Sequence, residues 1–383
     1  MSRKHLKERS KGFGPQVLQG RAGTQETPRK DSLIISKGQA IMGQRDPMKE
    51  ARFYERGEDG RVRCHLCFHE CLIKDGNRGI CGVRENRGGT LFSLVYGRSI
   101  SEAVDPIEKK PLFHFLPGTK TFSIATVGCN FKCLHCQNYS ISQVSGDQGQ
   151  IPGDTLPPER IVLLAQQTGC QSIAYTYTEP TIFLEYAMDT AKLASLAGLK
   201  NVFVTNGYIT PEALRAMSPY LDGANIDLKA FSEDFYRKVC GARLKPVLDS
   251  IRLYKELDTW IEVTTLVIPN HNDSDEELRN IACFVADIDR TIPWHVTQFY
   301  PTYRLQDQPR TPLKTLERAR EIGTEAGLKY VYQGNVPGAG GENTYCPGCG
   351  RLLVERLGYT IQNFSIVGGK CPACGETISG IGL

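Results

Sequence analysis

The sequence contains no long hydrophobic run. None of its 383 residues lies in a continuous apolar stretch of the length that a membrane-spanning helix needs. The first thirty residues are polar and basic, so they also lack the apolar core of a secretory signal. Both absences argue against insertion into a membrane or transport across one. We therefore expect a cytoplasmic protein with no membrane partner.

A general excess of positive charge is also missing. The formal net charge is +4, but residues 1–47 hold ten Lys or Arg against four Asp or Glu, which leaves the other residues with a net charge of −2. A nucleic-acid partner is therefore not expected. Residues 1–47, rich in Gly, Gln and Lys, are expected to form a disordered basic tail. One hypothesis is that this tail is not native and that Met48 is the true start.

Cysteine, in contrast, is abundant, with fourteen residues in the chain. Disulfides are rare in the reducing cytosol, so we expect these thiols to bind metals. Eleven of them fall into three groups along the sequence. The other three lie in segments with helical patterns, and we expect them to be inert core residues: Cys170, Cys240 and Cys283.

The central group has three cysteines and no fourth. Cys129, Cys133 and Cys136 form a Cys-x3-Cys-x2-Cys loop after an apolar run over residues 122–127. Iron–sulfur clusters and structural zinc sites ordinarily use four protein ligands. A four-iron cluster held by three cysteines would keep one iron open for another ligand. The alternative is a zinc knuckle whose fourth ligand lies elsewhere in the chain.

The N-terminal group lies in residues 48–112, a Gly-rich segment too small for a core of its own. It has the pattern Cys64-x2-Cys67-x3-Cys71 followed by Cys81. Four cysteines in such a segment predict a metal site that staples it. Zinc and a second iron–sulfur cluster both fit the pattern. The sequence favours zinc, because nothing in the spacing demands iron.

The C-terminal group consists of two Cys-Pro-x-Cys-Gly knuckles in residues 338–383. Cys346 and Cys349 form the first knuckle, and Cys371 and Cys374 form the second, with twenty-one residues between them. This pattern predicts a zinc ribbon. A rubredoxin-like iron site is the minor alternative.

Residues 113–337 alternate between strand and helix patterns. A capping sequence from Ser274 to Glu277 opens one helix, Pro211 and Pro312 are each expected at a first helical position, and Gly327 is expected to follow a helix end. The expected strands, rich in Val, Ile, Thr and aromatic residues, cover residues 122–127, 172–177, 201–206, 224–229, 260–268, 295–300 and 329–333. Repeated alternation predicts a parallel sheet or barrel.

Polar motifs follow several of these strands. They are residues 178–180 with Glu179, residues 205–207 with Asn206, and residues 227–229 with Asp227 and Lys229. The cysteine loop also follows a strand. Because the carboxyl ends of barrel strands carry the active site, we expect these motifs to meet at one rim. His295, Tyr303 and Arg304 on the last strands are further candidates for facing the pocket, although none of them is expected to be catalytic.

With these motifs, the chain beyond residue 47 resembles the radical SAM enzyme of the AmmeMemoRadiSam system, which is related to the pyruvate formate-lyase activating enzymes. The match is carried by residues 64–71, 81–84, 105–115, 129–138, 177–180, 204–207, 227–229 and 334–335 and by the ribbon. The resemblance implies an α/β fold, a partial (β/α)6-type radical SAM barrel flanked by a small N-terminal Cys-rich metal segment and a C-terminal zinc ribbon.

The resemblance also implies roles for individual residues. Cys129, Cys133 and Cys136 would ligate a [4Fe-4S] cluster, whose open iron binds S-adenosyl-L-methionine. The contacts to that cofactor would come from His135 near the adenine, Glu179 near the methionyl amino group, and Asn206, Asp227 and Lys229 near its carboxylate or the ribose.

Two departures from the pattern of the activating enzymes stand out. Tyr177 and Thr178 replace the two glycines that precede Glu-Pro in that pattern, and Val204 stands where the activating enzymes have Asp. If that Asp helps to hold a monovalent cation, the cation site is not expected in this chain.

The implied reaction is the reductive cleavage of S-adenosyl-L-methionine to methionine and a 5′-deoxyadenosyl radical, which abstracts hydrogen from a substrate. The electron would come from a donor such as flavodoxin or ferredoxin. We favour modification of a small molecule, RNA or protein, with Memo-like and AMMECR-like proteins as candidate partners. The alternative within the class is an activase that generates a glycyl radical on a partner protein.

Two hypotheses from other classes stay open. A zinc-rich binding module would place basic and aromatic residues around its knuckles, yet only Arg351, Arg356 and Lys370 lie near the ribbon. An electron-transfer protein would carry a second iron–sulfur cluster at the N-terminal cysteines. The substrate itself cannot be inferred from these motifs, because they describe the half of the site that holds the cofactor.

Overall fold

The computed structural model describes residues 48–143, 151–336 and 338–383. The basic tail and the hypothesis about its origin fall on residues 1–47, which lie outside the described residues. In the described part of the chain, no helix is both long enough and apolar enough to cross a membrane.

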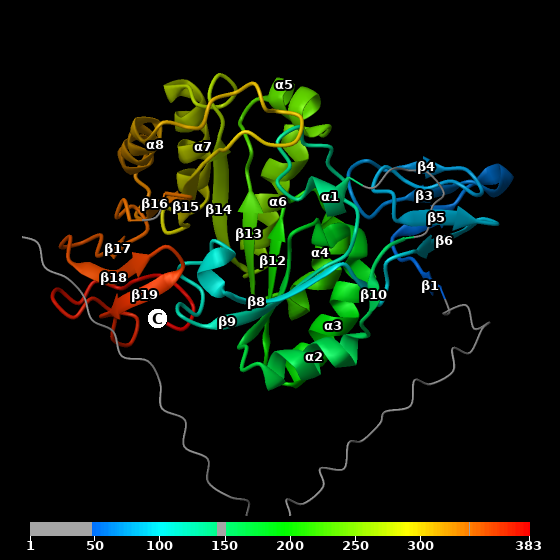
Figure 1. The fold of residues 1–383 in the computed structure, drawn as a ribbon, viewed down its shortest axis with the longest axis horizontal. Helices are drawn as coiled ribbons and strands as arrows, with labels where there is room; N and C mark the ends of the chain where they lie inside the picture. The colour runs from blue at the N-terminus through cyan, green and yellow to red at the C-terminus, as the bar shows by residue number, and fades with distance from the viewer. Residues whose placement is uncertain (1–47, 144–150, 337) are drawn as a thin grey trace, which may run out of the picture. The chain divides into compact units, whose positions relative to one another are not determined.

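A central sheet of eight strands positions everything else (Figure 1). Its strands are hydrogen-bonded in the order β16-β15-β14-β13-β12-β11-β9-β8. All neighbouring pairs are parallel except β8 with β9, which is antiparallel. The bounds are β8 Ser101–Pro106, β9 Lys120–Ala125, β11 Ser172–Tyr175, β12 Lys200–Thr205, β13 Gly223–Asp227, β14 Trp260–Val267, β15 Trp294–Gln298 and β16 Val331–Gly334.

All seven strands expected from the sequence are present, so the sheet has one parallel strand more than the six of the expected barrel. Helices connect the parallel strands, as strand–helix alternation predicts. They are α2 Pro158–Gln167, α3 Leu184–Leu196, α4 Pro211–Met217, α6 Leu244–Glu256, α7 Asp275–Ile288 and α8 Leu313–Glu325. Shorter helical elements are α1 Tyr139–Ser142 and α5 Glu233–Phe235, which continues into a π turn over Tyr236–Cys240.

The helix ends follow the expected local rules with two differences. Pro211 opens α4, and Gly327, with φ +93°, follows the end of α8. Helix α8 begins one residue later than expected, with Pro312 as its N-cap. Ser274 caps α7 by accepting from the Glu277 N–H, whereas the Glu277 carboxylate accepts from the Phe231 N–H instead of completing the capping box.

One cysteine assignment was wrong. Cys170 and Cys240 are buried as expected, but Cys283 is exposed. Helix α7 buries its Leu278, Ile281 and Val285 side, and residue 283 falls between the buried positions on the outer face of the helix. The pattern of the whole helix, rather than the residue type, decides the burial of this cysteine.

The N-terminal segment packs on the barrel through small antiparallel sheets. The apolar residues Val62, Leu66 and Val83 join the same core cluster as the barrel residues. A fully buried ion pair between Arg84 and Glu185 of α3, 2.9 Å apart, adds a polar tie. The strands are β1 Lys49–Glu50, β2 Tyr54–Arg56, β3 Val62–Cys64, β4 Leu72–Ile73, β5 Arg84–Arg87 and β6 Thr90–Ser93, with β7 Arg98–Ser99 pairing β10 Asp154–Thr155.

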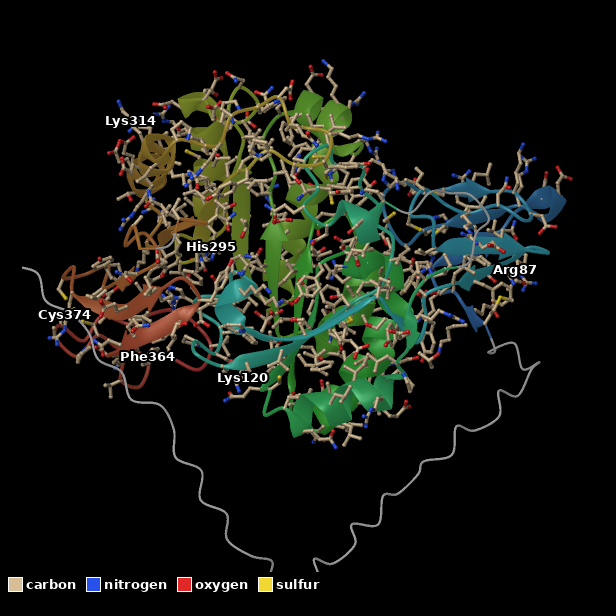
Figure 2. The ribbon with its side chains drawn as sticks, viewed as in Figure 1. Arg87, Lys120, His295, Lys314, Phe364 and Cys374 are labelled. Atoms are coloured by element: carbon tan, nitrogen blue, oxygen red, sulfur yellow. The ribbon has the colours of Figure 1, made fainter. Side chains whose placement is uncertain are left out.

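The C-terminal segment is a three-stranded antiparallel sheet that docks on the end of the barrel. Its strands are β17 Thr344–Tyr345, β18 Leu352–Leu357 and β19 Thr360–Phe364, and Phe364 and Cys374 mark it in Figure 2. The buried Arg356 guanidinium donates to the Phe113 carbonyl at 2.9 Å. His114 bridges the Ser379 carbonyl at 2.7 Å and the Tyr332 hydroxyl at 2.6 Å.

The buried His114 makes stability depend on pH. Burial lowers its pKa from the ordinary 6.5 to about 4, although the nearby Glu262 carboxylate acts in the opposite direction. Because the folded pKa lies below the unfolded one, stability is complete above pH 6.5 and falls as the pH drops toward 4. We expect His114 to account for a loss of about 1 kcal/mol in unfolding free energy between pH 7.5 and 5.5.

Urea unfolding of the wild type and a His114→Gln variant at these two pH values measures the contribution of His114 to the unfolding free energy. Glutamine can keep a donor and an acceptor but has no proton to gain in this range. The wild type should therefore lose about 1 kcal/mol more than the variant on acidification. Equal losses in the two proteins would contradict this account of the docking contact.

Candidate active site

A cavity of about 500 Å³ opens at the carboxyl ends of the parallel strands. Its wall includes residues that directly follow β9, β11, β12 and β13, the place where barrel enzymes carry their sites. All eight residues of the expected cluster and cofactor site line this one cavity, namely Cys129, Cys133, His135, Cys136, Glu179, Asn206, Asp227 and Lys229. The structure thus brings together motifs that lie up to a hundred residues apart in the sequence.

The cysteine loop is fixed by backbone bonds to the π turn. The Lys132 N–H donates to the Cys240 carbonyl at 2.8 Å, and the Leu134 N–H donates to the Val239 carbonyl at 2.9 Å. Within the loop, the Phe131 N–H donates to the Cys129 sulfur at 3.4 Å. These bonds hold the thiols in place without a disulfide, since every cysteine described is free.

The three thiols of this loop are neutral as they stand. Burial raises the pKa of Cys129 and Cys136, with the Glu179 carboxylate adding to the effect at Cys129. For Cys133, a hydrogen bond with the Cys240 thiol raises the pKa first and burial second. A bound metal therefore has to displace three protons, so that metal binding and proton release are coupled here.

The thiols of this loop do not form a compact set of ligands for a single ion. In a tetrahedral zinc site with Zn–S bonds of 2.3 Å, the sulfurs lie about 3.8 Å apart. Across the described residues, the only His, Cys, Asp or Glu group with three or more ligand atoms mutually within 4.8 Å is the C-terminal one. Cys240 touches Cys133, yet it does not complete such a group. Among the described residues, the loop therefore has no compact set of four ligands for a zinc knuckle.

Glu179 anchors the rim between β11 and β12. One carboxylate oxygen accepts from Thr181 N at 3.0 Å, from Thr181 Oγ1 at 2.6 Å and from Thr205 Oγ1 at 2.7 Å. The other oxygen accepts from Asn206 N at 2.8 Å. Burial raises the pKa of Glu179, and these four bonds counteract the rise. The carboxylate thus begins the 3₁₀ turn Pro180–Phe183 and also lines the cavity.

Charged and polar groups from the next strands complete this wall. Lys229 Nζ lies 2.9 Å from Asp227 Oδ2, and although burial disfavours its charge, the Asp227 carboxylate raises its pKa well above the ordinary value. Asn206 Nδ2 donates to Asn130 Oδ1 at 2.8 Å, next to Cys129. One rim therefore offers a carboxylate, an ammonium and an amide within a single cavity.

His135 is a neutral ring in this wall. Burial lowers its pKa to about 3, and the positive charge of Lys229 adds to the effect. Its Nδ1 atom is buried and has no hydrogen-bond partner among the described residues. The imidazole is therefore suited to a stacking or single-acceptor contact rather than to proton transfer.

Tyr177 adopts a left-handed backbone conformation, with φ +63°. Such a conformation costs a non-glycine residue of the order of 1 kcal/mol. Its contacts compensate, because the hydroxyl donates to Asp105 and Lys110 Nζ lies 4.5 Å from the ring centroid. Asn138 Nδ2 also donates to the Tyr177 carbonyl at 2.8 Å. These contacts fix Tyr177 in its left-handed conformation beside the cavity.

Sequence reasoning gave no role to four further residues that line the cavity, namely Lys109, Lys110, Asn138 and Tyr359. The two lysines pair with Asp105 at 2.9 and 2.6 Å, and they belong to the stretch 105–115 that carried part of the family resemblance. Tyr359 comes from the turn between β18 and β19, and no sequence signal could have placed that turn at the cavity.

The three candidates on the last strands are not part of the cavity lining. His295 is buried deeper in the sheet, where Nε2 lies 2.6 Å from Glu262 Oε2 and the ring contacts Phe113 (Figure 2). The Tyr303 ring stacks on Tyr139, and the Arg304 backbone N–H donates to the Leu134 carbonyl. These residues support the barrel and the cysteine loop.

The C-terminal cysteines form a compact set of ligands. Cys346 and Cys374 have sulfurs 3.5 Å apart, and Cys349 and Cys371 have sulfurs 3.7 Å apart. These separations match the value of about 3.8 Å for four thiolates around one tetrahedral ion. This segment therefore carries a preformed site for a single metal ion.

Comparison with known proteins agrees with the site. Residues 123–282, which include the cysteine loop and Lys229, match the radical SAM superfamily. The chain is 51% identical over 334 residues to the uncharacterized protein MJ0808 of Methanocaldococcus jannaschii, covering 86% of this chain and 99% of that protein. The chain therefore belongs to one family with MJ0808, and its residues 123–282 match the radical SAM superfamily.

Other similarities are more distant. MJ1632 of the same organism, named as a candidate glycyl-radical enzyme activating enzyme, is 26% identical over 220 residues, covering 55% of this chain and 77% of that protein. Among solved structures, a radical SAM methyltransferase from Sphaerobacter thermophilus superposes with a TM-score of 0.46 at 14% identity, covering 60% of this chain and 71% of that chain.

Gly128, at the start of the cysteine loop, allows the N-terminal segment to approach closely. It has φ +97°, and a Cβ atom would lie 2.7 Å from both the Cys81 carbonyl oxygen and Val83 Cγ1. We expect Gly128→Ala to lower the unfolding free energy by more than about 2 kcal/mol, through backbone strain and overpacking together.

Gly169→Ala is the matched control for this substitution. Gly169 has φ +70°, but a Cβ there would meet open space, so only the backbone strain of about 1 kcal/mol applies. Chemical denaturation of both variants measures the difference. Equal destabilisation would show that the close contact with Cys81 and Val83 is unimportant.

Proposed function

We propose that this protein cleaves S-adenosyl-L-methionine reductively and uses the resulting radical to abstract hydrogen from a substrate. The observation that carries the proposal is the cavity, which three thiols of one loop line together with Glu179, Asn206 and Lys229. When bound, a [4Fe-4S] cluster with one open iron supplies the electron that breaks the carbon–sulfur bond.

The residues of the cavity have complementary tasks in this proposal. Cys129, Cys133 and Cys136 would hold three irons of the cluster. Glu179 presents a buried negative charge for the methionyl ammonium, and Lys229 presents a positive charge for its carboxylate. Asn206 offers a side-chain amide to the same end of the cofactor. The neutral ring of His135 would contact the adenine, and Asp227 would orient Lys229 or approach the ribose.

We further propose that zinc occupies the C-terminal site. Four cysteine sulfurs with contacts of 3.5 and 3.7 Å fit the tetrahedral geometry of structural zinc. The metal would hold the segment that contributes Tyr359 to the cavity wall. Its function is therefore structural, and the rubredoxin-like alternative would use the same ligands with iron.

Further lining residues bear on the substrate. Lys109, Lys110 and Tyr177 line the same cavity as the cofactor residues, and Tyr359 adds a contribution from the C-terminal segment. The additional lining from the C-terminal segment favours modification of a small molecule or of a narrow segment of RNA or protein. Memo-like and AMMECR-like proteins are candidate partners, and a cytoplasmic flavodoxin or ferredoxin would supply the electron.

A second candidate function is the activation of a glycyl-radical enzyme. The similarity to MJ1632, whose name assigns that activity as a candidate, favours it. The two functions differ in where the radical ends up. An activase would leave a stable glycyl radical on a partner protein, which electron paramagnetic resonance detects, whereas the favoured function would leave a modified substrate and no protein radical.

The proposal predicts formation of 5′-deoxyadenosine by the reduced enzyme. Anaerobically reconstituted protein, dithionite and excess S-adenosyl-L-methionine are combined, and 5′-deoxyadenosine is measured by chromatography. The Cys129→Ala, Cys133→Ala, Cys136→Ala triple variant should lose this activity at least a hundredfold, or about 3 kcal/mol in transition-state terms, because it cannot hold the cluster.

Cys170→Ala is the matched control, since this buried thiol lies outside the cavity lining. It should retain wild-type activity. If the wild-type protein binds iron and S-adenosyl-L-methionine but forms no 5′-deoxyadenosine with any reductant, the proposed reaction is wrong. If the triad loads only zinc, the proposed cofactor is wrong as well.

A further inference from the structure

We propose that Cys64, Cys67, Cys71 and Cys81, here called the N-terminal cysteine site, bind a second iron–sulfur cluster rather than zinc. The sequence alone favours zinc at these residues, and the arrangement of the side chains points the other way. The inference does not depend on the reaction proposed for the main cavity.

The fold brings the four thiols to one place. Cys64 ends β3, and its N–H donates to the carbonyl of Cys71 at 3.0 Å, which makes the two residues cross-strand neighbours. Cys67 lies in the turn between them, and Cys81 arrives from the following loop. All four line one pocket, whose other walls are largely apolar: Leu66, Ile73, Ile80 and Ile182.

The sulfur spacing separates this site from the C-terminal one. The C-terminal set has sulfur contacts of 3.5 and 3.7 Å, the distances of a single tetrahedral ion. No three thiols of the N-terminal cysteine site, in the part of the chain described, lie mutually within 4.8 Å. The sulfurs of Cys129, Cys133 and Cys136 do not do so either. Both sets therefore differ from the compact C-terminal one.

Arg84 offers a buried polar group that a bound cluster would satisfy. Its side chain is almost fully buried and lines the pocket of the four cysteines. Two guanidinium nitrogens bind Glu185 at 3.0 and 2.9 Å, but Nε has no hydrogen-bond partner among the described residues. A buried donor without a partner is costly, and a sulfide or thiolate of a bound cluster would satisfy it.

The proposed cluster would lie directly behind the cysteine loop of the main cavity. His69 Nε2 is 2.7 Å from the Asn130 carbonyl, and Thr210 Oγ1 donates to the His65 carbonyl at 2.7 Å. Gly128 has no side chain that could separate Cys81 from the loop. The two sites are thus joined by direct contacts.

Metal analysis of the triple variant with Cys129, Cys133 and Cys136 changed to Ala tests the proposal. Without the cluster of the main cavity, any remaining iron belongs to another site. Protein made with iron and sulfide supplied and purified anaerobically should contain about four iron, about four sulfide and about one zinc per chain. About two zinc and no iron per chain would overturn the proposal.

Two further variants assign the metals to their sites. Cys67→Ala, Cys81→Ala in the triple-variant background should remove the iron and sulfide and keep the zinc. Cys349→Ser, Cys374→Ser should remove the zinc and keep the iron. If the first pair removes zinc instead, the N-terminal site is a zinc site and the proposal fails.

Mössbauer spectroscopy of the wild-type protein covers the case in which a variant does not fold. Two four-iron clusters give about eight irons per chain, and one cluster gives about four. A wild-type protein that binds S-adenosyl-L-methionine and holds only four irons would overturn the second cluster while leaving the proposed reaction intact. A protein that binds eight irons but forms no 5′-deoxyadenosine would overturn the proposed reaction and leave the second cluster intact.

Discussion

The cavity depends on one buried carboxylate. A carboxylate in such a place must collect hydrogen bonds, and Glu179 collects four, from Thr181, Thr205 and the Asn206 backbone. These bonds tie the residues after β11 to the residues after β12. Asn206, held in this way, reaches Asn130 beside the first cysteine. The hydrogen bonds that the buried Glu179 carboxylate requires thus fix the spacing between the proposed cluster ligands and the proposed cofactor contacts.

Two small segments outside the barrel support the cysteine loop and complete the lining of the cavity. The N-terminal segment supports the cysteine loop from behind, through Gly128 and the Arg84 to Glu185 ion pair. The C-terminal segment docks through His114 and Arg356 and adds Tyr359 to the cavity. Each segment carries four cysteines, and metal ligation is a usual way for small segments to gain stability. Metal binding at these cysteines would therefore also affect the shape of the cavity.

The hydrophobic period of the segments and the spacing of the motifs made much of the fold and of the site predictable. All seven parallel strands, Pro211 at the start of α4 and Gly327 after α8 follow from local patterns, and the strand-end motifs predicted one shared rim. Cys283 could not be placed, because its burial depends on which side of α7 meets the core. Tyr359 was missed, because tertiary docking rather than any motif brings it to the cavity, and Lys110 lies in a stretch that the family resemblance covers without giving this residue a role. His135, Asp227 and Lys229 line the cavity as expected, and their roles stay predictions.

The central claim is that the three-cysteine loop leaves one iron open for the amino and carboxylate groups of S-adenosyl-L-methionine. Electron–nuclear double resonance on the reduced protein, with the cofactor labelled by ¹⁵N at the amino group and ¹⁷O at the carboxylate, tests this directly. The account predicts hyperfine coupling of both nuclei to the cluster, unchanged in Cys170→Ala and absent from the triple cysteine variant. A reduced cluster that shows no coupling to either label, while the cofactor is bound, would contradict it.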